Sequence, residues 1–178
     1  MKYSHAAMIG LVGGLLVFSG PAMADRDAFS TGPVIEDFGP VADVPGAFSL
    51  APETELRVAF DTSTAAEADD LNRTLVSAAR FINMHGRAGV DPANIHLAIV
   101  LHGQAVRDVA SVEGGQSVAN AALIEALLDH NVEIYVCGQS AAYYDVATDD
   151  LLPGVTMSIS AMTAHALLQQ DGYTLNPF

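Results

Sequence analysis

Four short apolar runs, separated by segments with helical periodicity, constrain the fold more than any other feature of this sequence. The runs cover residues 56–61, 95–101, 132–136 and 155–159. Continuous runs rich in β-branched and aromatic residues are typical of strands that are buried on both faces of a parallel sheet. Strands that alternate with helices favour a doubly wound arrangement. The pattern therefore predicts an α/β fold with a parallel sheet and helices on both faces.

Helices are expected in the intervals between these runs. Residues 64–67 (Thr-Ala-Ala-Glu) have the spacing of a capping box and predict that the first helix begins there. Apolar residues at three- and four-residue steps then give this helix one buried face, and Gly86 is its predicted end. The second helix is predicted to begin at Ser117 or Asn120. The last is expected over residues 161–170.

The first 24 residues have the pattern of a secretory signal peptide. Lys2 supplies a positive charge, residues 6–18 form an apolar run, and Ala22-Met23-Ala24 has the small-x-small form of a cleavage site. The apolar run is short for a membrane span, which needs about 20 residues. Cleavage after Ala24 is therefore favoured over a membrane anchor, and we expect an exported, periplasmic protein that is not attached to the membrane.

Removal of 24 residues from the 178 would leave 154, which suits one domain with a sizeable core.

The net charge of the chain narrows the classes of molecule that it could bind. The whole chain carries a net charge of −14, and the loss of Lys2 would make this about −15. The basic residues are scattered along the chain. An acidic surface without a basic cluster argues against nucleic acid and anionic membranes as partners.

Residues 25–55 are predicted to form an extended arm. This stretch is rich in Gly-Pro and Pro-Gly pairs and has neither helical nor strand periodicity. Isolated apolar residues such as Val34, Ile35 and Phe38 favour packing over the domain or over a neighbouring subunit rather than disorder. The α/β domain would then cover residues 56–178 and end in a short apolar tail.

Cys137 directly follows the third apolar run and is the only cysteine in the chain. A single cysteine cannot form an internal disulfide in an oxidising compartment, so the thiol is either buried and inert or kept for reaction. Ligands collect at the carboxyl ends of parallel strands. Backbone N–H groups of a following helical turn favour a thiolate. The residues alone leave both alternatives open.

Other polar residues are expected near the same edge of the sheet. His102 closes the neighbouring strand and could act as a base or donor, or simply bond to backbone. Gln139 and Ser140 could donate hydrogen bonds to a bound sulfur. The remaining candidate binding residues, each with an ordinary strand-end or helix-capping explanation, are Gly103, Gly138, Ser160 and Thr163. The sequence contains no convergent set of metal ligands and no motif that calls for a cofactor.

Several segments together resemble the DsrE/DsrF-like family. They are His102-Gly103 after an apolar run, then residues 132–140, 152–155, 160–163 and 168–173. The resemblance covers roughly residues 56–178, and Cys-Gly-Gln-Ser at 137–140 is its most specific part. It implies a flavodoxin-like sheet, assembly into homotrimers or homohexamers, and a link to sulfur metabolism. It also implies that Cys137 carries sulfur as a persulfide.

These inferences predict a periplasmic sulfur-handling protein, either a sulfurtransferase or a sulfur carrier. Cys137 would carry or accept a sulfane sulfur by thiolate exchange, aided by His102, Gln139 and Ser140. The partner would be a small-molecule or protein donor or acceptor. The alternative is a non-catalytic module that binds a small ligand or serves assembly, in which Cys137 is an inert packing residue.

Overall fold

A five-stranded parallel sheet forms the centre of the molecule, with the strand order β4-β3-β2-β1-β5. The computed structural model describes residues 26–67, 70–111 and 117–176. In chain order the strands and α-helices are β1 (Leu56–Thr62), α1 (Arg73–Arg87), β2 (Ile95–Leu101), α2 (Ser117–Asp129), β3 (Glu133–Cys137), α3 (Gly138–Tyr143), β4 (Val155–Ser158), α4 (Ala161–Gln170) and β5 (Thr174–Asn176). Short 3₁₀ turns occupy Arg26–Ala28, Pro92–Asn94, Gly103–Val109 and Thr148–Asp150.

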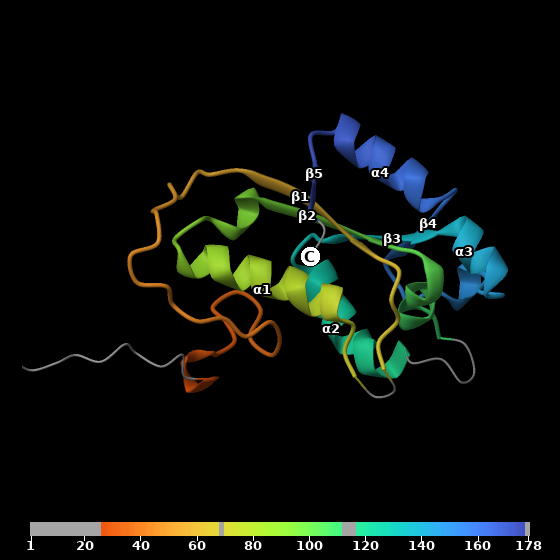
Figure 1. Ribbon diagram of the computed structural model, residues 1–178, viewed down its shortest axis with the longest axis horizontal. Coiled ribbons are helices and arrows are strands. Elements are labelled where there is room, and N and C mark those ends of the chain that lie inside the picture. The colour runs from red at the N-terminus through yellow and green to blue at the C-terminus, as the bar shows by residue number, and fades with distance from the viewer. Residues whose placement is uncertain (1–25, 68–69, 112–116, 177–178) are drawn as a thin grey trace, which may run out of the picture.

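Helices cover both faces of the sheet, as predicted. Figure 1 shows α1 and α2 on one side and α4 on the other. Successive side chains of a strand point to opposite faces, so each strand contributes to two cores. The larger core lies under α1 and α2 and includes Phe60, Leu97, Ile99 and Ile134. The smaller core lies under α4 and consists of Ala59, Ala98, Val100, Ala164, Leu168 and Tyr173.

The four predicted strands are present, and a fifth was missed. Residues 174–176, interpreted from sequence as part of an apolar tail, form β5 and pair in parallel with β1. Thr174 and Leu175 are exposed. A three-residue edge strand with little buried surface has no periodic pattern that sequence reasoning could detect.

The predicted start of the first helix at residues 64–67 is wrong. The helix begins at Arg73, and its N-cap is Asn72, whose side chain accepts a hydrogen bond from the Thr74 N–H. The Asn72 amide donates to Asp108 at 2.6 Å, and its backbone N–H donates to Asn120 at 2.8 Å. These two partners lie far away in sequence, and they fix the N-cap eight residues after Thr64, where the apparent capping box begins.

The second helix begins at Ser117, one of the two predicted starts. Asn120, the other, is fully buried inside α2, where its side-chain oxygen accepts from Asn72. The predicted end of α1 at Gly86 is one residue early, because the helix continues to Arg87. Gly86 faces the N-terminal arm instead. A Cβ at this position would come within 2.7 Å of Val34 Cγ2.

The described part of the N-terminal arm, residues 26–55, packs on α1 of the same chain. Ile35 and Val41 are buried, with 2% and 1% of their surface exposed. Arg87 donates hydrogen bonds to the carbonyl oxygens of Ser30, Thr31, Gly32 and Val41. Asn83, one helical turn earlier, bonds to five further backbone groups of the arm.

The predicted signal peptide at residues 1–24 lies outside the described residues. Within residues 26–67, 70–111 and 117–176, no helix is both long enough and apolar enough to cross a membrane.

Candidate functional site

Three polar side chains meet where adjacent strands end. Asp61 lies near the end of β1, His102 directly follows β2, and Cys137 is the last residue of β3. Parallel pairing aligns these ends, because Asp61 and Thr62 are in register with Val100 and Leu101. The residues two positions before Asp61, His102 and Cys137 are Ala59, Val100 and Tyr135, in that order. All three pack with the core under α4. The period of two along a strand therefore directs all three polar side chains to the face that α4 covers.

These side chains line an open hollow of about 560 Å³ between the strand ends and α4. Its wall consists of Asp61, His102, Cys137, Gln139, Ser160, Ala161, Met162, His165, Ala166, Gln169 and Leu175. Cys137 itself is only 6% exposed. It is therefore a buried thiol that nevertheless forms part of the wall of a solvent-connected hollow.

Hydrogen bonds favour the thiolate form of Cys137. Burial acts to raise the pKa of the thiol, but donors from the Ser140 hydroxyl and from the backbone N–H groups of Ser140, Ala161 and Gln139 outweigh it. The pKa of Cys137 consequently lies below its ordinary value. Three of these four donors, on Gln139 and Ser140, belong to the first turn of α3, which begins immediately after the cysteine.

Ser140 connects the cysteine to the neighbouring strand. The Gly103 N–H donates to Ser140 Oγ at 2.9 Å. Because the hydroxyl oxygen is occupied as an acceptor, its own proton is available to Cys137. Gly103 has a φ of +52°, and a Cβ there would lie 2.9 Å from the Ser63 carbonyl oxygen. The two motifs noted in the sequence, His102-Gly103 and Cys-Gly-Gln-Ser, thus form one hydrogen-bonded unit.

Gly138 permits the close approach of β4 to this unit. A Cβ on Gly138 would lie 2.5 Å from the carbonyl oxygen of Ser158 and 3.2 Å from that of Ile159. Any larger residue would push the end of β4 away from the turn that carries Cys137. The residue therefore serves the geometry of the site through packing against the neighbouring strand end.

The remaining predicted residues divide between two places. Gln139 and Ser160 line the hollow beside Cys137. Ser160 caps α4, as predicted, by accepting from the Thr163 N–H at 3.1 Å, and Gln139 Nε2 donates to the Ile159 carbonyl at 3.4 Å. Thr163 does not line this hollow; its hydroxyl shares a hydrogen bond with Ser160 and lies beside a second hollow.

Neither Asp61 nor His165 was predicted to be a site residue, but the structure places both in the wall of the Cys137 hollow. Asp61 Oδ1 accepts from His165 Nε2 at 2.7 Å, and Oδ2 accepts from His102 Nε2 at 3.1 Å. The period of two along β1 could have placed Asp61 on this face and edge. His165 is 104 residues away from Asp61 in sequence, and no local pattern could have paired them.

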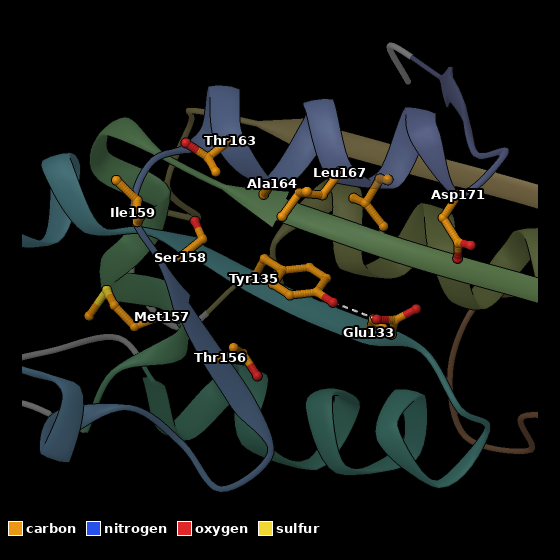
Figure 2. Close-up of a pocket in the computed structure, with 11 residues that line it drawn as sticks. Glu133, Tyr135, Thr156, Met157, Ser158, Ile159, Thr163, Ala164, Leu167 and Asp171 are labelled. Atoms are coloured by element: carbon orange, nitrogen blue, oxygen red, sulfur yellow. Dashed lines mark hydrogen bonds between the residues drawn. The ribbon is translucent and has the colours of Figure 1, made fainter.

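A second hollow, of about 430 Å³, lies on the face of β3 and β4 beside α4 (Figure 2). Its apolar lining includes Ile159, Ala164 and Leu167. Glu133 accepts hydrogen bonds from the hydroxyls of Tyr135 and Tyr173. The hydrogen bond to Glu133, together with burial, raises the pKa of Tyr135 to about 12, so this phenol stays protonated at physiological pH.

Metal binding finds no support in the part of the chain that the structure describes. No group of three or more histidine, cysteine, aspartate or glutamate side chains there could hold a metal ion. The cluster of Asp61, His102 and His165 is held together by direct hydrogen bonds between its own members.

Comparisons with known proteins agree with this fold. The protein of unknown function MTH1491 from Methanobacterium thermoautotrophicum is 16% identical, with a TM-score of 0.51 over 70% of this chain and 100% of its own. The ychN protein from E. coli is also 16% identical, with a TM-score of 0.52 over 69% of this chain and 99% of its own. At this identity the likeness concerns the fold alone. No protein with a curated description matches the sequence.

A family model supplies the classification. The model of the DsrE/DsrF-like family matches residues 56–177. This match spans β1 to β5 and includes the cysteine turn, the strand ends around it and α4. Since it covers most of the chain, the protein belongs to the DsrE/DsrF-like family.

Proposed function

We propose that the protein carries sulfane sulfur as a persulfide on Cys137, receiving it from a donor and passing it to an acceptor. The observation that carries this proposal is the environment of the thiol. Four hydrogen-bond donors lower its pKa, and its side chain lines an open hollow. An inert core cysteine has no need of either feature. Membership of the DsrE/DsrF-like family supports a proposed role in sulfur handling.

The same hydrogen-bond donors stabilise the Cys137 thiolate in both halves of a sulfur transfer. A thiolate attacks the sulfane sulfur of a donor, and a thiolate must again leave when the sulfur moves to an acceptor. Donors at Ser140, Gln139 and Ala161 stabilise the anion in either direction. Gln139 and Ser160 line the hollow, where they are proposed to contact the donor. The proposed location is the periplasm, because residues 1–24 have the pattern of a signal peptide.

Intact-mass analysis tests the proposal directly. The protein is purified from its native compartment, or incubated with polysulfide, and weighed before and after reduction. We expect a gain in steps of one sulfur atom that dithiothreitol reverses. Because the chain has one cysteine, the position of any persulfide is unambiguous. Absence of any gain, together with alkylation only after unfolding, would support an inert cysteine and the binding-module alternative.

The pH dependence of alkylation is expected to report the lowered pKa. The rate of reaction with iodoacetamide should reach half its plateau at a lower pH in the folded protein than in the same protein unfolded in urea, because hydrogen bonds stabilise the folded thiolate. The midpoint is the useful quantity, since burial slows the reaction at every pH. Ser140→Ala should move the midpoint upward. A folded midpoint at or above the unfolded one would contradict this environment.

Self-assembly into a trimer or hexamer is a further part of the proposal. Ile159, Met162 and Leu167, at the end of β4 and along α4, are between 60% and 80% exposed. Apolar side chains exposed together favour an interaction surface. Light scattering should give a multimeric mass for the wild type and a smaller one for Leu167→Glu. The control Phe48→Glu changes an exposed residue on the arm and should leave the mass unchanged. A monomeric wild type would exclude assembly.

One observation favours a second candidate function, the binding of a small ligand away from the cysteine. The hollow in Figure 2 combines apolar walls with the Glu133 carboxylate and the Thr156 hydroxyl. Pockets of about 300–1,000 Å³ with a few polar groups are typical of small-molecule sites. This function is independent of sulfur uptake by Cys137, and it would remain if Cys137 gained no sulfur.

A further inference from the structure

Asp61 lies between two histidines in the wall of the Cys137 hollow, and both of its carboxylate oxygens accept hydrogen bonds from them. We propose that Asp61 is a positioning residue for His102, and that His102 carries the proton in sulfur exchange at Cys137. The hydrogen bond from His165 holds Asp61 in place. This inference rests on the proposed persulfide chemistry. It adds a proton-transfer unit made from the ends of β1 and β2 and from α4.

The hydrogen-bond geometry fixes which ring nitrogen can exchange a proton. An ionised carboxylate only accepts hydrogen bonds, so the Nε2 atoms of His102 and His165 both donate to Asp61. The Nδ1 atom of each ring then remains. A carboxylate that holds one imidazole nitrogen in this way orients the ring and leaves the other nitrogen for proton transfer.

The two histidines differ in what surrounds that remaining nitrogen. The His165 side chain is 15% exposed, and its Nδ1 is buried without a hydrogen-bond partner among the described residues. A proton placed there would have no acceptor, so His165 acts as a fixed donor that holds Asp61 in place. The His102 side chain is 34% exposed and lines the hollow with Cys137. His102 is therefore the ring that can exchange a proton with a bound donor.

The loading step then balances as follows. The Cys137 thiolate attacks the terminal sulfur of a persulfide donor, R–S–SH. A sulfur–sulfur bond forms to Cys137, the bond within the donor breaks, and its electron pair leaves with R–S⁻. The protonated ring of His102 gives its proton to R–S⁻. The products are the Cys137 persulfide, R–SH and neutral His102, with no change in total charge and no other reagent.

Unloading returns a proton to His102. Neutral His102 takes the proton of an acceptor thiol, R′–SH, and the resulting thiolate attacks the outer sulfur held by Cys137. The bond to Cys137 breaks, R′–S–SH departs, and Cys137 leaves as a thiolate that its hydrogen-bond donors stabilise. His102 is protonated again. Asp61 faces the ring throughout and balances the positive charge that His102 carries from the end of unloading until the next loading step.

The experiment compares two reactions of the same thiol over a range of pH. Loading from glutathione persulfide requires a proton for the leaving thiolate, whereas alkylation by iodoacetamide releases iodide and requires none. Asp61→Asn is expected to slow loading by about 100-fold and to change alkylation by less than about 3-fold, because the thiolate donors stay in place. The titratable groups that line the hollow are Asp61, His102, Cys137 and His165.

The pH profiles give a readout that a purely structural role would not move. Wild-type loading should fall on both sides of an optimum, because attack needs the thiolate and departure needs the protonated ring. Alkylation should only rise to a plateau. In Asp61→Asn, loading should lose its alkaline fall. In a variant that already carries His102→Gln, adding Asp61→Asn should slow loading little further, since the Asp61 carboxylate acts through the His102 ring.

Each other outcome overturns the inference. If the wild type takes up sulfur and Asp61→Asn loads at the same rate, Asp61 has no positioning role, and the proposed function stands. If loading and alkylation fall together, Asp61 merely supports the fold around Cys137. If the wild type takes up no sulfur from the persulfide, the proposed function and this inference fail together.

Discussion

A Cys137→Ser variant is expected to fold normally and to take up no sulfur from polysulfide or glutathione persulfide. The serine hydroxyl can accept the hydrogen bonds that the Ser140 hydroxyl and the neighbouring backbone N–H groups make to the thiol. The change therefore leaves those donors with a partner, and we expect the free energy of unfolding to change by less than about 1 kcal/mol. A hydroxyl ionises far less readily than a thiol, so sulfur exchange should stop altogether.

The measurements are intact mass after incubation with the donor and the midpoint of urea unfolding. Cys137→Ala serves as the companion variant. It removes the same sulfur but leaves the surrounding donors without their acceptor, so it should be the less stable of the two. Retention of sulfur by Cys137→Ser, in the same steps and at the same stoichiometry as the wild type, would mean that the sulfur is held elsewhere and without a covalent bond to this residue.

The cysteine side of the site could be predicted because its signals are local. The run before Cys137 and the helical turn after it identify a strand end in a parallel sheet, and His102 occupies the same position on the next strand. The hydrogen bond from Gly103 to Ser140 then joins two segments that each looked ordinary by themselves. Their pairing follows from the adjacency of β2 and β3, which sequence periodicity alone leaves open.

The features that could not be predicted from the sequence depend on contacts between distant segments of the chain. Residues 64–67 have a genuine capping-box pattern, but Asn72 caps α1 because Asp108 and Asn120 bind it. The pairing of Asp61 with His165 requires α4 to return across the face of β1. Local patterns therefore predicted most of the elements and the position of Cys137 at a strand end, whereas the helix boundary and the contacts of Asp61 with His102 and His165 were set by tertiary hydrogen bonds.

Replacing Asn83 with leucine is expected to produce the largest loss of stability of any change considered for the scaffold. Asn83 is fully buried on α1 and makes five hydrogen bonds to the arm. It accepts from the backbone N–H groups of Val34 and Ile35, and it donates to the carbonyls of Ile35, Phe38 and Gly39, at distances of 2.8–3.2 Å. Leucine has a similar volume but satisfies none of these groups. Since each unsatisfied buried group costs about 1–3 kcal/mol and partial rehydration recovers some of this, we expect a loss of about 3–5 kcal/mol.

Urea unfolding and limited proteolysis distinguish loss of the arm from loss of the domain. If the arm detaches while the sheet persists, the urea dependence of the unfolding free energy should fall, because less surface remains to be exposed, and cleavage should concentrate in residues 26–55. The matched control is Asn94→Leu, since Asn94 makes one exposed hydrogen bond to the Pro52 carbonyl, and its loss should cost less than about 1 kcal/mol. Equal effects of the two substitutions would mean that Asn83 is not what holds the arm on α1. Because Asn83 lies on the face of the sheet opposite to α4, sulfur uptake by Cys137 in the surviving domain should continue, which separates the stability of the arm from the chemistry of the strand ends.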